Sequence, residues 1–313
     1  MRRLPKLLAA GAALAVPAAL NARLARRAPP QPEGLPGEPR YLPWTEGYVR
    51  YVVDGEGPPL VLVHGIYPGA SAREWSRVVP ALTATHRLYV PDLLGFGLSD
   101  RPRISYDPRL YEALLAAFLD EAVREPAAVC ATSLSGAFAV HAAFQRPDSV
   151  TRLALVSPTG VYAHAEPPGT GRFLLHRTLR LPVLGLSAHN ASTRRAALAR
   201  WLQEGLGMDP EALTSAELAD LYAEARQPGA AWALAAFRAG LLDEPVERVF
   251  PDLRPPTLLL WGRRARLAPF EGAGGFVTLR PTTELEAFAR SGDLPHVEEP
   301  EPFAAALLRW LAA

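Results

Sequence analysis

Short apolar runs alternate with helical patterns through the first half of the chain, and this alternation restricts the possible folds most strongly. The runs typical of buried strands are Leu60–Gly65, Arg87–Gly95, 126–133 and Val150–Pro158. Helical patterns lie between them, and one continuous helix is expected over residues 71–86. Strands that alternate with helices predict a mostly parallel sheet covered by helices on both faces, which is an α/β fold.

The alternation breaks after residue 159 and resumes near residue 251. The interval is mostly helical in pattern and contains a capping box, Thr214 to Glu217. Strand patterns return at Pro256–Gly262, and a helical pattern ends the chain. The sequence therefore predicts a helical cap inserted into an α/β core. The expected parts are a leader at 1–28, a Pro/Gly-rich linker at 29–40, a core at 41–159 and 251–313, and a cap at 160–250.

Basic residues flank an apolar run from Leu7 to Leu20 on both sides. The run is shorter than the roughly 20 residues that a membrane-spanning helix needs. It fits either an uncleaved, membrane-associated helix or a signal peptide, with a disordered leader as a third reading. Membrane association through residues 1–28 is thus one expectation, and the location stays open between cytoplasm, membrane surface and export.

Charge and residue usage exclude several classes of function. The net charge is +1, from 33 basic and 32 acidic residues, and no dense basic block supports nucleic-acid binding. Cys130 is the single cysteine, so no intramolecular disulfide can form. The seven histidines are scattered and no phosphate-binding loop is visible, so we expect no metal and no cofactor. The oligomeric state is left open.

The stretch CATSLSGAF, residues 130–138, joins a predicted strand to a predicted helix. Ser133 has small residues two places away on either side, Ala131 and Ser135. A nucleophilic serine on a sharp strand-to-helix turn needs small neighbours, because bulk there would clash with adjacent backbone. The alternative interpretation is that Ser133 only caps the helix that follows.

Six motifs run in a fixed order along the predicted elements: HGIYPG, PDLLGFGLSD, ATSLSG, LVSPTG, LLLWGRRARLAP and SGDLPHVEEP. In this order they resemble the α/β-hydrolase superfamily, in the branch with a helical cap between the sixth and seventh strands. The resemblance implies that Ser133 occupies the nucleophile position. It implies an oxyanion hole made by the backbone amides of Ile66 and Leu134. His64 and Gly65 would shape the loop that presents Ile66.

The chain departs from the family pattern at two positions. The acid position carries Ala265, and the position of the catalytic histidine carries Asp293. His296 is a possible alternative base, although packing beside the last helix is the simpler interpretation. The remaining candidates are the cap histidines His164, His176 and His189.

The loop that lost its acid contains Arg263, Arg264 and Arg266, and the loop that lost its histidine gained Asp293. Arginine pairs bidentately with carboxylate. We therefore predict an arginine–aspartate ion pair between the two loops. Asp92 and Asp100, after the fourth strand, are expected to brace loops.

Two main functions remain open. The first is an esterase-like serine hydrolase whose incomplete triad makes turnover weak or non-standard, since a serine hydroxyl needs a base to become a good nucleophile. The second is a non-catalytic protein that binds a small apolar ligand in the same pocket. The expected partner is in either case a small apolar or ester-like molecule. A membrane-linked interaction protein is a third possibility.

Overall fold

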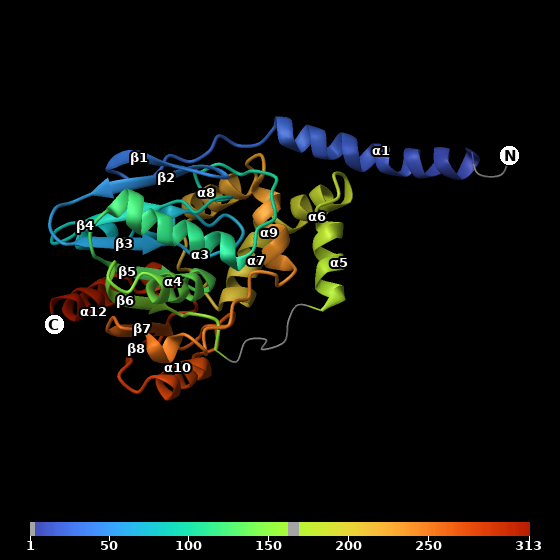
Figure 1. Ribbon diagram of the computed structural model, residues 1–313. Helices are drawn as coiled ribbons and strands as arrows, with labels where there is room; N and C mark the ends of the chain where they lie inside the picture. Colours follow the sequence, from blue (N-terminus) through green and yellow to red (C-terminus); the bar gives the residue numbers. More distant parts are fainter. Residues whose placement is uncertain (1–3, 162–168) are drawn as a thin grey trace.

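The computed structural model describes residues 4–161 and 169–313. Within them one sheet runs through the core in the order β1-β2-β4-β3-β5-β6-β7-β8, with helices on both faces (Figure 1). The strands are β1 (Glu38–Trp44), β2 (Gly47–Asp54), β3 (Pro59–Val63), β4 (Arg87–Pro91), β5 (Ala127–Thr132), β6 (Val150–Val156), β7 (Thr257–Gly262) and β8 (Glu284–Phe288). The predicted α/β fold is confirmed.

The core helices cover the sheet, and the cap helices stand beyond the ends of its strands (Figure 1). The core helices are α2 (Val79–Leu82), α3 (Pro108–Ala117), α4 (Leu134–Gln145), α10 (Ala273–Leu279), α11 (Pro295–Glu298) and α12 (Pro300–Ala312). The cap helices are α5 (Thr170–Leu179), α6 (Leu184–Ser192), α7 (Arg195–Leu206), α8 (Ser215–Ala225) and α9 (Ala230–Arg238). Short turns are η1 (Ala72–Trp75), η2 (Phe118–Val123), η3 (Phe250–Asp252) and η4 (Phe270–Gly272).

Only β2 runs against the direction of the other strands. β1 pairs antiparallel with β2, and β2 pairs antiparallel with β4. From β4 to β8 all pairings are parallel, with β3 between β4 and β5. Because parallel strands end at the same edge of the sheet, the loops that follow β3, β5, β7 and β8 meet there.

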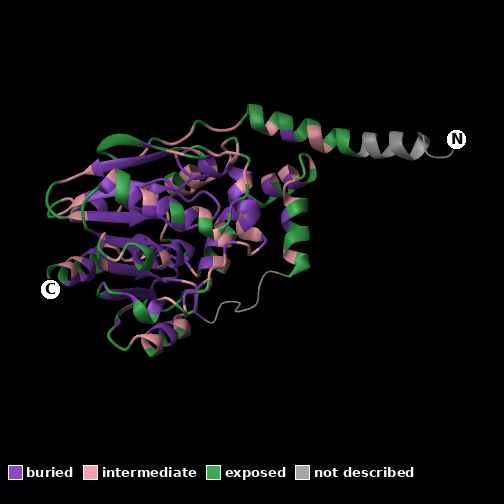
Figure 2. Ribbon diagram, in the orientation of Figure 1, coloured by how far each residue is buried: buried purple, intermediate pink, exposed green. Residues whose placement is uncertain are grey.

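The central strands of the sheet are buried on both faces, as their continuous apolar sequences require. Along β5, Val129 and Ala131 join the cluster under α3 and α4, while Cys130 joins the cluster under α12. Figure 2 shows the strands from β3 to β7 mostly in the colour of buried residues. This two-sided packing fixes the end of β5, and with it the start of the turn that holds Ser133.

Local signals set several helix ends. The Asp107 side chain accepts a hydrogen bond from the Leu110 amide at 2.9 Å and so caps the start of α3. The capping box at Thr214 and Glu217 is formed and begins α8. The helix predicted over 71–86 is wrong: the segment contains only η1 and α2, with Pro80 in the first turn of α2. Proline cannot donate the amide hydrogen bond that a longer helix would need there.

The linker lies along the protein surface and holds the leader to the body. Gln31 donates hydrogen bonds to the Gly97 carbonyl and to Glu224 of α8. The Pro29 carbonyl accepts from Gln227 at 3.2 Å, and the Glu33 carbonyl accepts from Arg73 at 2.7 Å. The core begins earlier than predicted, because β1 starts at Glu38 rather than near Tyr41.

The leader forms helix α1 (Leu4–Arg26), which contains Pro17. Asn21 is buried against the cap: its amide donates to the Val183 carbonyl at 3.1 Å and to the Ser187 hydroxyl at 3.0 Å. Of the helices described, none is long and apolar enough to cross a membrane.

Candidate active site

Ser133 occupies the sharp turn between β5 and α4. Its backbone has φ 54° and ψ −126°, a conformation that side-chain-bearing residues rarely adopt and that costs about 1–3 kcal/mol. The Ser133 amide donates to the Val156 carbonyl at 2.8 Å, which ties the turn to β6. Its hydroxyl does not cap α4, and this buried Oγ has no hydrogen-bond partner among the described residues. The capping interpretation of Ser133 therefore lacks support.

The small neighbours of Ser133 are fully buried, as a tight turn requires. Ala131 and Ser135 both have 0% exposure. The Ser135 hydroxyl donates to the His64 carbonyl at 2.7 Å. The turn is therefore joined directly to the loop that follows β3.

The two backbone amides expected to form an oxyanion hole come from these adjoining segments. Leu134 is the first residue of α4, so its amide has no acceptor in a preceding helical turn. Ile66 follows His64 and Gly65 after β3, and its amide has no protein acceptor within the described part of the chain. Both donors are thus available to a bound oxygen atom.

His64 holds the loop in place rather than serving as a base. Its Nε2 accepts from the Leu93 amide at 2.9 Å, so the ring proton resides on Nδ1. Nδ1 in turn donates to the Gly65 carbonyl at 2.6 Å. The fully buried ring therefore connects the loop after β3 with the loop after β4.

Glu74 is a buried carboxylate at this site that sequence reasoning did not single out. One oxygen accepts from the Gly65 amide at 3.0 Å, and the other accepts from His296 Nε2 at 3.0 Å. Burial by itself would raise the pKa of Glu74, but the hydrogen bond and charge of His296 hold it below its ordinary value. The charged carboxylate therefore supports the backbone directly before Ile66.

His296 is held away from a catalytic role by these contacts. Its ring stacks on Trp75 with centroids 4.2 Å apart, and its side chain has no exposure. Nε2 is bound to Glu74, and the buried Nδ1 has no hydrogen-bond partner among the described residues. The structure therefore favours the packing interpretation of His296.

Asp293 is fully buried and joins the two loops that follow β7 and β8. Its Oδ2 accepts from the amides of Arg266 at 2.8 Å and Leu267 at 3.0 Å, and its Oδ1 accepts from the Ala268 amide at 2.9 Å. Burial raises the pKa of Asp293 to about 6, although these three amides oppose the shift. Ala265, expected at the acid position, lies just before these amides.

The predicted arginine–aspartate ion pair is wrong. Among the described residues Asp293 forms no ion pair, because backbone amides satisfy its oxygens. The Arg263 guanidinium lies 4.7 Å from the centroid of the Phe270 ring, and that of Arg264 lies 3.9 Å from Asp209. The Arg266 guanidinium donates to the Glu204 carbonyl at 3.3 Å. The loops are connected as proposed, but through the main chain.

Neither of the two cap histidines that the structure describes, His176 and His189, is in hydrogen-bond contact with Ser133. His189 Nε2 donates to the Ala225 carbonyl at 2.8 Å, and burial lowers the pKa of His189 to about 4. His176 is buried in α5, which lowers its pKa. His164 lies outside the described residues.

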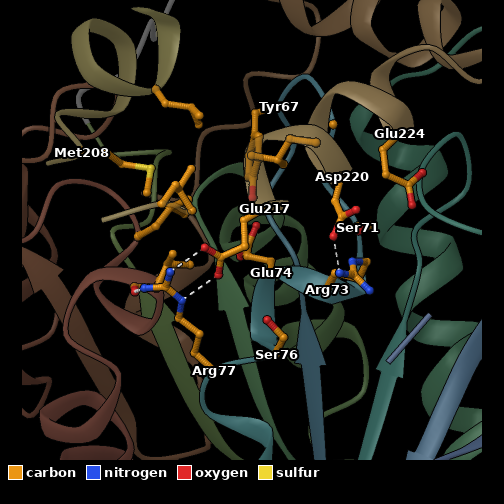
Figure 3. A pocket seen from close by; sticks show the side chains of 16 residues that line it. Tyr67, Ser71, Arg73, Glu74, Ser76, Arg77, Met208, Glu217, Asp220 and Glu224 are labelled. Carbon is orange, nitrogen blue, oxygen red and sulfur yellow. Dashed lines mark hydrogen bonds and ion pairs between the residues drawn. The ribbon is translucent and has the colours of Figure 1, made fainter. Parts of the chain in front are cut away.

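A small cavity borders the loop that carries Ile66 (Figure 3). It encloses about 60 Å³ between that loop, α8 and α11, with the ion pairs Arg77–Glu217 and Arg73–Asp220 in its wall. Ligand pockets usually measure about 300–1,000 Å³. This cavity can therefore hold water-sized groups, and we do not assign a substrate to it.

A family model for the alpha/beta hydrolase fold matches residues 58–300. The chain belongs to the α/β-hydrolase family. Curated relatives include a 2-hydroxy-6-oxo-2,4-heptadienoate hydrolase of Pseudomonas putida, 29% identical over 268 residues, which cover 83% of this chain and 91% of the relative. A pimeloyl-[acyl-carrier protein] methyl ester esterase of Vibrio atlanticus is 28% identical, with 82% and 95% covered.

Solved structures agree with this assignment. A membrane phospholipase A, described as a bacterial virulence factor, is 26% identical with a TM-score of 0.69 and covers 100% of this α/β-hydrolase and 98% of its own chain. The Cfl2 protein of Burkholderia cenocepacia has a TM-score of 0.74 over 90% of this chain and 98% of its own. Its identity of 24% supports a shared fold alone.

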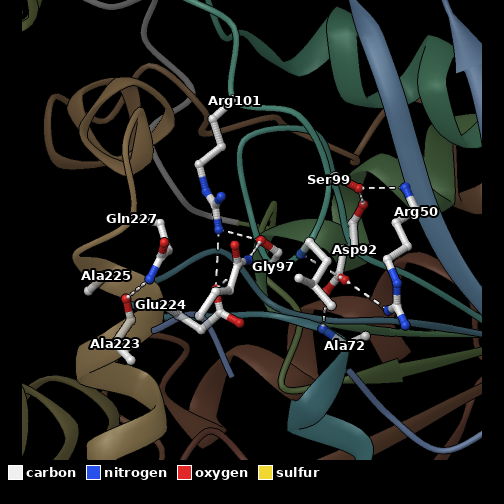
Figure 4. Close-up of polar contacts among 12 residues, drawn as sticks. Arg50, Ala72, Asp92, Gly97, Ser99, Arg101, Ala223, Glu224, Ala225 and Gln227 are labelled. Atoms are coloured by element: carbon white, nitrogen blue, oxygen red, sulfur yellow. Dashed lines mark hydrogen bonds and ion pairs between the residues drawn. The ribbon is translucent and has the colours of Figure 1, made fainter. Parts of the chain in front are cut away.

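Asp92 and Asp100 brace loops in this α/β-hydrolase, as expected. Asp92 accepts from the amides of Ala72 at 2.7 Å and Leu98 at 3.0 Å, beside Arg50 (Figure 4). Asp100 accepts from the Tyr48 amide at 2.8 Å. Their carboxylates are therefore committed to the main chain.

The fold also brings Glu112, His141 and Glu244 together, with possible ligand atoms within 4.8 Å of one another. The sequence alone showed no such group, because its members lie on α3, on α4 and after α9. His141 Nε2 already donates to the Pro245 carbonyl at 3.1 Å. Protein contacts thus account for this imidazole, and we assign no metal to the group.

Proposed function

We propose that the chain is a carboxylic-ester hydrolase of low turnover in which Ser133 is the nucleophile. The observation that carries the proposal is the strained backbone of Ser133, with a buried hydroxyl that no described residue binds. Strain of this kind persists where the surrounding structure enforces it, and it clusters at active sites. A residue needed only for packing at this turn would be better served by glycine.

The available groups support the first step of an acyl transfer. The Ser133 hydroxyl attacks an ester carbonyl, and the amides of Ile66 and Leu134 stabilise the oxyanion. Glu74 and His64 hold the Ile66 loop in position through Gly65. These residues position the oxyanion donors and do not touch the substrate.

The step of the reaction that the site supports least is removal of the proton from the Ser133 hydroxyl. Loss of triad function costs on the order of 10⁶ in turnover, while an oxyanion hole and binding alone retain about 10³ over water. Asp293 and His296 are both engaged by other groups, so an external base or hydroxide has to complete the step. We therefore expect slow acylation that becomes faster as pH rises.

Two of the relatives support an ester as the substrate class. They include a methyl ester esterase and a phospholipase A, and both names denote hydrolysis of carboxylic esters. The 2-hydroxy-6-oxo-2,4-heptadienoate hydrolase acts on a different class of substrate. Activated esters of short and long fatty acids are therefore the first compounds to test.

Labelling with a fluorophosphonate probe tests the proposal, because the probe reacts with an activated serine and needs no deacylation. The full chain is compared with Ser133→Ala, and p-nitrophenyl esters are assayed in parallel. We expect slow labelling that Ser133→Ala abolishes. Equal labelling of both proteins, or none after many hours at pH 9, would refute the role of Ser133.

The second candidate is a non-catalytic protein that binds a small apolar ligand. It is favoured by one observation: Asp293 makes three hydrogen bonds to backbone amides where a catalytic histidine is expected. Absence of labelling together with saturable binding of a fatty acid, measured by calorimetry, would support this function instead.

A further inference from the structure

Large apolar side chains are unusually exposed on the leader and on the first part of the cap. They lie on α1, on α5 and at the turn into α6, and we call them the cap–leader face: Leu14, Val16, Leu20, Phe173, Leu174, Leu175, Leu181 and Leu184. Elsewhere in the described chain such exposure is scattered, at Tyr41, Tyr48, Phe144 and Leu285. Exposed apolar side chains concentrated on neighbouring elements point to an interaction site, whereas scattered ones need no explanation.

The parts of this face are fixed to one another. Besides its bonds to Val183 and Ser187, Asn21 accepts a hydrogen bond from Asn190 at 3.0 Å. Figure 1 shows α1, α5 and α6 together at the side of the molecule away from the sheet. Figure 2 shows much of α5 and of the described part of α1 in the colour of exposed residues. Asn21 thus holds α1 against α6, and α6 in turn packs on α5.

The charges on these segments all have the same sign. Residues 1–28 and 170–193 contain no aspartate or glutamate. Arg23, Arg26, Arg27 and Arg177 are exposed, and none of them forms an ion pair within the described residues. Apolar side chains rimmed by unpaired arginines match the interface of an anionic bilayer, where acyl chains lie below negative headgroups.

We propose that the cap–leader face rests on an anionic lipid bilayer, with α5 and the turn into α6 dipping into the headgroup region beside α1. The bilayer covers side chains such as Phe173 and Leu174, which are 51% and 65% exposed. Arg177 and the arginines that end α1 contact lipid phosphates. Peripheral attachment requires no membrane-spanning helix. The inference goes beyond the proposed function and does not depend on the chemistry of Ser133.

Flotation of the full chain with lipid vesicles tests the inference. One set of vesicles is phosphatidylcholine alone, and the other also contains phosphatidylglycerol. The test variant is Phe173→Glu with Leu174→Glu. The matched control is Phe144→Glu with Leu285→Glu, which places the same charges on exposed apolar positions far from the face.

We expect the native chain and the control to float with the anionic vesicles, less so as salt increases. The double variant on α5 should bind at least about 100-fold more weakly, because its apolar contact is replaced by two like charges against the lipid. Arg177→Gln should weaken binding about fivefold. Thermal melts check that each variant is folded.

Three results would overturn the inference. The native chain could fail to float with either vesicle, or the α5 variant could bind as well as the control. Sedimentation without lipid could also show a dimer that the α5 variant alone dissociates, with no vesicle binding by the native chain. That outcome would assign the face to contact between two copies of the chain.

Discussion

The buried carboxylate of Asp293 makes a quantitative prediction about stability and pH. Its pKa is raised from an ordinary value of 3.8 to about 6, chiefly by burial. Each pKa unit corresponds to 1.36 kcal/mol, so this group lowers the free energy of unfolding by about 3 kcal/mol once it is ionised. Between these two pKa values the folded state binds more protons than the unfolded state. The contribution of Asp293 to the free energy of unfolding therefore falls as pH rises from about 4 to about 6.

The substitution that tests this is Asp293→Asn, which removes the titrating carboxyl and keeps a side chain of nearly the same shape. The asparagine oxygen can still accept from two of the three amides, but its NH2 group faces the third donor. One unsatisfied amide costs about 1–3 kcal/mol, independent of pH. The variant should therefore be less stable than the native chain near pH 4 and should recover about 3 kcal/mol relative to it by pH 7.

Urea unfolding followed by tryptophan fluorescence, at steps from pH 4 to pH 7, gives the difference between the two proteins. Taking the difference cancels a raised carboxyl that Asp293 does not influence, such as Glu224 with a pKa of about 7. A repeat at high salt is the control, since a buried group is screened little. A difference that stays constant within about 1 kcal/mol over this range would refute the reasoning.

Three other substitutions test the site. Ser133→Gly should be about 1 kcal/mol more stable than Ser133→Ala in urea unfolding, because glycine relieves the positive φ; equal stabilities would argue against strain at the turn. Glu74→Gln should lower the free energy of unfolding at pH 7 by about 3 kcal/mol, since it breaks a buried pair with His296, and a loss below about 1 kcal/mol would contradict this. Ala265→Asp combined with Asp293→His should speed fluorophosphonate labelling at least about 100-fold by supplying a base, whereas an unchanged rate would show that position 293 does not reach the nucleophile.

The fold followed from local patterns in the sequence. The strand runs, the Asp107 cap and the Thr214 capping box are encoded within a few residues of where they act. The helix expected over 71–86 does not form as one piece because Pro80 lacks the amide hydrogen that a continuous helix needs there.

The site was less predictable because its contacts span the chain. Glu74 and His296 are 222 residues apart, and no local pattern relates them. Asp293 was expected to pair with arginine side chains, but its partners are backbone amides, which every residue except proline carries. Residue type therefore gave no signal of the actual contact.

The linker contacts have a practical and mechanical consequence. Pro29, Gln31 and Glu33 connect the leader to α8, to the loop after β4 and to η1. Deletion of residues 1–40, the boundary suggested by composition, would remove these contacts and the first residues of β1 together. For the same reason, a force applied to α1 is transmitted to the cap through both the linker and Asn21, so that α1 and the cap move together.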